Sequence, residues 1–199
     1  MPVIGITGGV ASGKTTAYRM LREELAADGV SSDEIASGLL AGDPEVQAEI
    51  SRYFGSGVLE RPGGAIDRAA LRRRVFADAD DRRALEAILH PRIRRRWLDL
   101  ARRAREAGAR VFLVEIPLLF ETAADRHCDC SVVVGCSRQN QLARLRESRG
   151  LDHQEAAAII AAQWPLTEKL DAADIVLWND GILRVLAGQV ASLAATLSQ

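Results

Sequence analysis

The segment from Gly8 to Thr15, which reads Gly-Gly-Val-Ala-Ser-Gly-Lys-Thr, constrains the fold of this chain most strongly. It fits the pattern G-x-x-x-x-G-K-[ST] and lies between an expected strand over residues 2–7 and an expected helix over residues 13–29. In such a strand-loop-helix arrangement, backbone N–H groups turn toward a phosphate and the helix N-terminus adds its dipole. The sequence therefore predicts a nucleoside-triphosphate site at this loop.

The chemistry of the loop assigns two roles to its last residues. Lys14 is expected to reach the β- and γ-phosphate oxygens, and the Thr15 hydroxyl is expected to ligate Mg²⁺. The residues expected to contact the nucleotide are Gly8, Gly9, Val10, Ala11, Ser12, Gly13, Lys14, Thr15 and Thr16.

Beyond the loop, the pattern of apolar residues predicts an α/β protein with a P-loop NTPase-type parallel sheet flanked by helices. Further strands are expected over residues 110–116, 130–135 and 175–178, whereas residues 30–32 are too few to predict a strand. Residues 33–108 read as helical, with one loop over residues 55–64. We therefore expect a nucleotide-binding core of residues 1–32 and 109–199, interrupted by an all-helical insert of residues 33–108.

Residues typical of helix starts mark the helices of the insert. Asp43 precedes Pro44 as an N-cap precedes a proline at the first helical position, and Asp67 is expected to cap the next helix. Asp33 is expected to cap the first helix of the insert, and Pro91 is expected to open a long arginine-rich helix.

Composition and charge exclude several classes of protein. The 26 Lys and Arg residues nearly balance the 27 Asp and Glu residues, which argues against a general nucleic-acid-binding protein. The longest apolar stretch, residues 111–120, is interrupted by Glu115 and is shorter than the ~18–20 residues of a membrane helix. No signal peptide is apparent, and three cysteines suit a reducing compartment, so we expect a cytoplasmic protein. We also expect neither membrane nor nucleic-acid partners, and a monomer or weak oligomer.

The basic residues are almost all arginines, since Lys14 and Lys169 are the only lysines. The arginines between Arg92 and Arg105 could bind an anion, or they could form a solvated helix face.

Other residues indicate which class of nucleotide-binding protein this chain belongs to. A regulatory GTPase needs N-K-x-D after a late strand, but the residues around Asn179 lack it, and Glu115 could be a strand-end carboxylate of the nucleotide site or a structural residue. A small kinase fits the size best.

Several stretches in chain order resemble the dephospho-coenzyme A kinase family. The most specific are Leu89-His90-Pro91 and Pro117-Leu118-Leu119-Phe120-Glu121, because a phosphate loop alone fits any nucleotide kinase. The others are Ile6-Thr7-Gly8-Gly9, Asp33-Glu34-Ile35-Ala36, residues 66–72, Val75-Phe76, Gln163 with Lys169, Ala173-Asp174 and Asn179.

The resemblance implies that ATP with Mg²⁺ phosphorylates the ribose 3′-hydroxyl of dephospho-coenzyme A. It implies a helical lid over about residues 144–164 whose Arg144 and Arg149 stabilise the transferring phosphoryl group, and Asp33 as the base that accepts the hydroxyl proton. It also implies that Asn179 contributes to the ATP site, and that the acceptor is bound by Asp33, Leu89, His90, Pro91 and Glu121.

Two positions depart from the family pattern. Ser31 stands where the family has an aspartate, and Ser148 stands where it has an arginine, with Arg149 next to it. These departures leave an ATP-binding protein with little catalysis as an alternative interpretation. Another small-acceptor kinase, of the nucleoside or shikimate type, is a further alternative, which Leu89-His90-Pro91 disfavours.

Overall fold

The computed structural model describes residues 1–61 and 64–198 and divides into two compact units. The first unit comprises residues 1–31 and 101–199, and the second comprises residues 32–100. The second boundary falls inside a long helix rather than at the turn near Gly108, so the last residues of the expected insert pack with the first unit.

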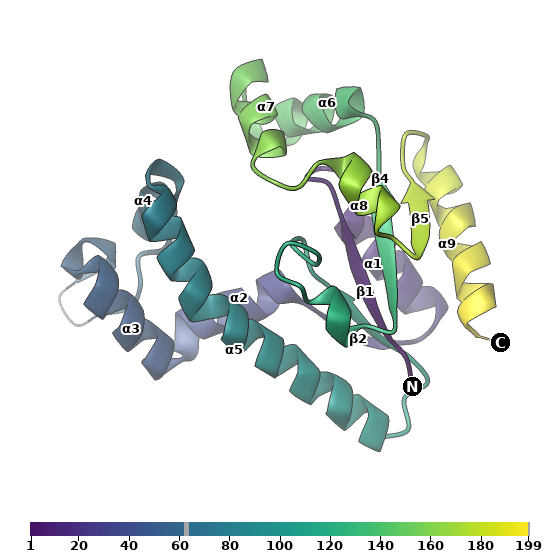
Figure 1. Cartoon of the computed structure of the whole chain (residues 1–199), viewed down its shortest axis with the longest axis horizontal. Helices are drawn as coiled ribbons and strands as arrows, with labels where there is room; N and C mark the ends of the chain where they lie inside the picture. Colours follow the sequence, from purple (N-terminus) through teal and green to yellow (C-terminus); the bar gives the residue numbers. More distant parts are fainter. Residues whose placement is uncertain (62–63, 199) are drawn as a thin grey trace. The chain divides into compact units, whose positions relative to one another are not determined.

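A five-stranded, wholly parallel sheet forms the centre of the first unit, in the order β2-β3-β1-β4-β5 (Figure 1). The α/β fold expected from the sequence is confirmed. Every residue of β1 is buried, as its apolar sequence predicts for a strand covered on both faces. The short segment before Ser32 does form a strand, because its backbone pairs with β3. The strands are β1 (Val3–Gly8), β2 (Asp28–Ser31), β3 (Phe112–Glu115), β4 (Cys130–Gly135) and β5 (Ile175–Trp178).

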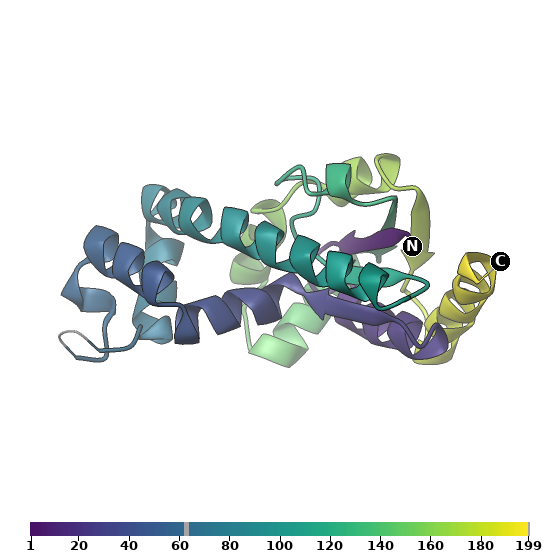
Figure 2. The same ribbon diagram turned by 90° about the horizontal axis from the view of Figure 1, so that it is seen from below.

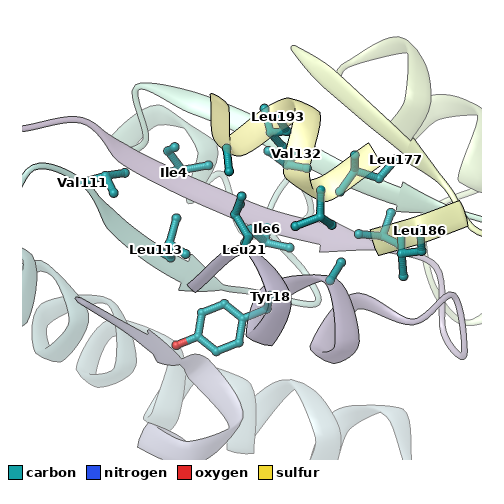
Figure 3. Packing of buried hydrophobic residues seen from close by; sticks show 14 residues of the cluster. Ile4, Ile6, Tyr18, Leu21, Val111, Leu113, Val132, Leu177, Leu186 and Leu193 are labelled. Carbon is teal, nitrogen blue, oxygen red and sulfur yellow. The ribbon is translucent and has the colours of Figure 1, made fainter. Parts of the chain in front are cut away.

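One hydrophobic cluster joins the sheet to two helices, α1 (Lys14–Glu24) and α9 (Leu183–Leu197) (Figure 3). Ile4 and Ile6 of β1 project from the same face because alternate residues of a strand do so, and Leu21 of α1 packs there. The remaining elements of this unit are η2 (Asp125–His127), α6 (Arg138–Arg149), α7 (His153–Ala161) and α8 (Leu166–Asp171).

The second unit is helical. It contains α2 (Ser32–Gly42), α3 (Pro44–Phe54), η1 (Ser56–Val58), α4 (Arg68–Ala77) and most of α5 (Ala79–Glu106), whose ribbons Figure 2 shows. These elements pack around a hydrophobic cluster that includes Val46, Ile50 and Leu89. The predicted caps are confirmed, since the Asp43 side chain accepts hydrogen bonds from two N–H groups of α3 and the Asp67 side chain does so for α4. The expected loop over residues 55–64 includes η1, and its residues 62–63 lie outside the described residues.

Two predicted helix starts were wrong. Pro91 lies inside α5, which begins at Ala79. The side chain of Asp78, the residue before this helix, accepts hydrogen bonds from the Asp80 and Asp81 N–H groups. Proline removes one hydrogen bond from a helix, but the packing of α5 outweighs that loss, and Arg92 Nη1 donates to the Ile88 carbonyl at 2.9 Å beside it.

Asp33 does not cap α2, because this helix begins one residue earlier at Ser32 and places Asp33 in its first turn. Among the described residues, no helix is long and apolar enough to cross a membrane.

Candidate functional site

The phosphate loop follows β1 at the edge of the sheet where all strands have their carboxyl ends. Gly13 has φ +94°, and a Cβ atom built there would lie 2.4 Å from Asn179 Nδ2, so the backbone conformation and the close approach both require glycine. Ala11 also has a positive φ, +57°. This tight curvature places α1 with its N-terminus at the loop, as phosphate binding requires.

Side chains from distant segments hold the carbonyl groups of this loop. Asn179, which follows β5, donates from Nδ2 to the Ser12 carbonyl at 2.8 Å. Arg144 of α6 donates to the carbonyls of Asn179 at 2.7 Å, Ala11 at 3.3 Å and Ser12 at 3.4 Å. Lys14 Nζ donates to the Gly9 carbonyl at 2.9 Å. The structure thus brings the predicted residues Lys14, Arg144 and Asn179 together at one loop.

Thr15 and Glu115 form a pair of oxygen donors next to the loop. The Thr15 hydroxyl donates to Glu115 Oε1 at 2.6 Å. Glu115 lies at the end of β3 and is buried, with an exposed fraction of 4%. A hydroxyl and a carboxylate are the oxygen ligands that Mg²⁺ prefers, directly or through water. The donor set therefore fits a magnesium ion better than Thr15 alone would.

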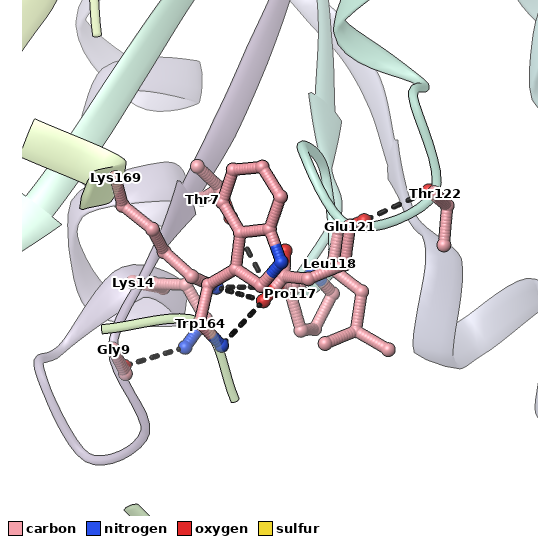
Figure 4. Close-up of polar contacts among 9 residues, drawn as sticks. All are labelled: Thr7, Gly9, Lys14, Pro117, Leu118, Glu121, Thr122, Trp164 and Lys169. Carbon is pink, nitrogen blue, oxygen red and sulfur yellow. Dashed lines mark hydrogen bonds and ion pairs between the residues drawn. The ribbon is translucent and has the colours of Figure 1, made fainter. Parts of the chain in front are cut away.

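A buried ion pair lies in the loop after β3 (Figure 4). Lys169 of α8 has an exposed fraction of 0% and donates from Nζ to Glu121 Oε1 at 2.7 Å and to the Pro117 carbonyl at 3.1 Å. Glu121 Oε1 also accepts the Trp164 backbone N–H at 3.2 Å, and Thr7 Oγ1 donates to the Pro117 carbonyl at 3.1 Å. We call Glu121, Lys169 and the Pro117 carbonyl the ion-pair anchor. Glu121, predicted to bind the acceptor, thus has its Oε1 atom held by Lys169 and by the Trp164 N–H.

Arg149 lies elsewhere than Arg144. It is exposed in the last turn of α6, five residues beyond Arg144. Ser148, at the position of the family arginine, donates its hydroxyl to the Arg144 carbonyl at 2.6 Å. The two arginines predicted to act together therefore have different environments in this structure.

The remaining predicted residues belong to the second unit. Leu89 is buried in its hydrophobic cluster, and His90 and Pro91 follow it in α5. Burial lowers the pKa of His90, Glu86 opposes this effect and Arg94 reinforces it. His90 is therefore neutral at pH 7 and can offer one donor and one acceptor to a ligand.

Arg92 of the arginine-rich helix is engaged within the second unit. Its guanidinium donates to Glu49 Oε1 at 2.7 Å, in addition to its bond to the Ile88 carbonyl. This pairing favours a structural role for Arg92 over an anion-binding one.

Gln141, a residue not predicted from the sequence, also belongs to the site, because its Nε2 donates to the Val10 carbonyl at 2.9 Å. It lies three residues before Arg144, so one turn of α6 places both side chains at the loop. That spacing was the available signal, but neutral glutamines occur on many helix surfaces. The sequence leaves two interpretations of Glu115 open, because its contact with Thr15 depends on the register of β1 and β3.

Comparisons with known proteins agree over nearly the whole chain. The family model described as dephospho-CoA kinase matches residues 2–184. A dephospho-CoA kinase from Anaeromyxobacter dehalogenans is 42% identical over 197 residues, which are 99% of this chain and 92% of the relative. The crystal structure of TT1252 from Thermus thermophilus has a TM-score of 0.81 at 32% identity and covers 100% of this chain and 98% of its own. A shikimate kinase from Bacteroides thetaiotaomicron shares the fold alone, with a TM-score of 0.52 at 15% identity, covering 100% of this chain and 99% of its own.

Proposed function

The chain belongs to the dephospho-CoA kinase family and phosphorylates the ribose 3′-hydroxyl of dephospho-CoA with ATP. We propose that its phosphate loop and the side chains around this loop carry out the transfer. The products are coenzyme A and ADP. The observation that carries the proposal is the Gly8–Thr15 loop at the carboxyl edge of the sheet, with Lys14, Arg144 and Asn179 at that loop.

Phosphoryl transfer needs positioning and neutralisation of charge more than covalent help from the protein. The loop N–H groups and the α1 N-terminus bind the phosphates of ATP, and Lys14 exchanges its bond to the Gly9 carbonyl for the β- and γ-phosphate oxygens. Arg144 stabilises the negative charge of the transferring group, and Arg149, on the same helix, adds a smaller contribution. Asn179 supports the loop through its hydrogen bond to the Ser12 carbonyl.

Mg²⁺ would be held by Thr15, with Glu115 holding its water ligands. When bound, the ion neutralises phosphate charge. The Cα atoms of Ser31 and Glu115 are register partners on adjacent strands, so the Glu115 carboxylate supplies negative charge at the strand end next to the position where Ser31 replaces an aspartate.

The acceptor side of the reaction depends on the second unit. Asp33, in the first turn of α2, accepts the proton of the ribose hydroxyl as general base. The family resemblance assigns acceptor binding to Leu89, His90 and Pro91, and also to Glu121 in the loop after β3.

Residues 144–164 form the lid, which includes α7 and ends at Trp164 beside the ion-pair anchor. We place the protein in the cytoplasm as a monomer or weak oligomer that acts on these small molecules and on neither nucleic acid nor membranes.

The test is ADP production from ATP and Mg²⁺ with dephospho-CoA, adenosine, AMP or shikimate as the acceptor. We expect turnover with dephospho-CoA only, and its loss in Lys14→Ala with ATP binding weakened. Turnover of another acceptor, or ATP binding without ADP formation on any of them, contradicts the proposal. The second outcome would mean that the changes at Ser31 and Ser148 have left an ATP-binding protein with little catalysis.

A further inference from the structure

Side chains from α6 and from the segment after β5 hold three consecutive carbonyl groups on the outer side of the phosphate loop. The Val10 carbonyl accepts from Gln141 Nε2 at 2.9 Å, the Ala11 carbonyl accepts from Arg144, and the Ser12 carbonyl accepts from Asn179. In a trans peptide the C=O and the following N–H point in opposite directions. The bond to the Val10 carbonyl therefore fixes the Ala11 N–H group so that it faces the other way.

Gln141 controls one of these peptides, the one between Val10 and Ala11. Its side chain is almost fully buried, with an exposed fraction of 3%, and α6 holds it there from its first turn. The start of α6 is itself fixed, because Ser137 accepts the Asn140 N–H and Asp180 accepts the Ser137 N–H at 2.7 Å.

The loop has a shape that admits this amide. A Cβ atom built at Gly9 would lie 2.4 Å from Gln141 Nε2, so a side chain at Gly9 would displace the amide from its position. The Val10–Ala11 peptide also precedes the positive φ of Ala11, a conformation that non-glycine residues rarely adopt and that surrounding contacts must maintain. Gln141 supplies one such contact directly at this peptide.

We propose that Gln141 is a positioning residue for ATP, which holds the Val10 carbonyl outward so that the Ala11 N–H faces the phosphates. The inference rests on the proposed ATP site at this loop. Gln141 does not touch the substrate in this role but acts through the loop backbone. Its loss should weaken the binding of phosphates and leave the binding of adenosine unchanged.

The experiment compares Gln141→Met, which keeps the length and removes the donor, with Gln139→Met, an exposed glutamine of the same helix. Calorimetry would measure the Kd of ATP, ADP and adenosine for each folded variant, with circular dichroism as the check of folding. We expect the Kd of ATP and ADP to rise about tenfold in Gln141→Met, in line with the loss of one buried hydrogen bond. The Kd of adenosine, and every Kd of Gln139→Met, should stay within about twofold of the parent protein.

Gln141→Glu gives a second and independent measurement. The ionised carboxylate repels the Val10 carbonyl, whereas the protonated acid can donate to it as the amide does. The Kd of ATP relative to that of the parent protein should therefore improve as the pH falls from 8 to 6. This variant keeps the proposal testable if Gln141→Met does not fold.

Two results would overturn the inference. One is Gln141→Met binding ATP as tightly as the parent protein, or losing adenosine affinity by the same factor as ATP affinity. The other is a Gln141→Glu defect that is the same at every pH. Turnover of dephospho-CoA by the unaltered protein tests the proposed function separately, so failure of the inference and failure of that function are distinguishable.

Discussion

The two lysines of this chain lie in two regions that use the same charged group in opposite ways. Lys14 is partly exposed on the phosphate loop and donates to the Gly9 carbonyl. Lys169 is fully buried in the ion-pair anchor, where it donates to a carboxylate and a carbonyl. The first lysine can exchange its partner for a ligand, whereas the second is committed to its protein partners. In a chain whose other cations are arginines, the compact ammonium group is used at these two positions.

The carboxylates of the two regions also differ in the kind of partner that they bind. Glu115 accepts the Thr15 hydroxyl beside the phosphate loop, and Glu121 accepts Lys169 and the Trp164 N–H in the anchor. Glu121 is paired with a cation of the protein, whereas Glu115 is bonded to a neutral hydroxyl beside the phosphate loop. Substitutions in the two regions should therefore separate loss of activity from loss of stability.

Lys14→Met should have the largest effect, a fall in kcat/KM of about 10³-fold or more, since the γ-phosphate loses a charged donor. The free energy of unfolding should change by less than about 1 kcal/mol, because the side chain is partly exposed. Steady-state kinetics and urea unfolding measure the two quantities. A large loss of stability would show that Lys14 has the structural role assigned to Lys169.

Lys169→Met should show the reverse pattern. Removing one partner of a buried pair leaves an uncompensated charge on Glu121, and the free energy of unfolding should fall by about 3–5 kcal/mol. Urea unfolding measures this fall, and the double variant Lys169→Met with Glu121→Leu should recover part of it because it removes both charges.

The activity of the folded Lys169→Met protein sharpens the comparison further. At a temperature where the variant is folded, kcat should fall by less than about tenfold, since the anchor acts through position rather than through contact with phosphate. A fall as large as that of Lys14→Met, with unchanged stability, would break the comparison.

The sequence predicted the phosphate loop and the parallel sheet well because both depend on local signals. Glycines, a lysine and a threonine at fixed spacing define the loop, and apolar runs define strands buried on both faces. Pro91 was misread as a helix start because a local rule for proline was applied where the packing of α5 decides the outcome. Local patterns therefore placed the elements but misplaced one long helix.

Contacts between distant segments could not be predicted in this way. The contact of Gln141 with Val10 and that of Lys169 with Glu121 join residues far apart in the sequence. Both depend on how the strands align in the sheet. Arg144 and Arg149 were both predicted to stabilise the transferring phosphoryl group, yet one lies at the loop and the other is exposed. The sequence supplied residues with the right chemistry, and the tertiary fold selected among them.

Arg144→Met and Arg149→Met test this selection on one helix. Arg144→Met should lower kcat/KM by about 10²-fold, since the Ala11 and Ser12 carbonyls lose their hydrogen bonds from Arg144 and the transferring group loses a cation. Arg149→Met should lower it by less than about tenfold, because this side chain is exposed and is not held at the loop. Measurement of kcat and the KM of ATP for both variants checks the ranking. Equal losses would indicate that Arg149 reaches the nucleotide as fully as Arg144 does.

The smallest expected effect compares the two carboxylates, through Glu115→Gln and Glu121→Gln. Glu115→Gln removes the charge beside Thr15, so the Mg²⁺ concentration for half-maximal rate should rise about tenfold, as it does when a group that supports metal binding is removed. Glu121→Gln should leave that concentration unchanged within about twofold and instead lower the free energy of unfolding, because Lys169 remains charged and buried. Titration of Mg²⁺ at saturating ATP and urea unfolding measure the two effects. If Glu121→Gln also shifted the Mg²⁺ requirement, the anchor would be part of the metal environment and the separation between the two regions would fail.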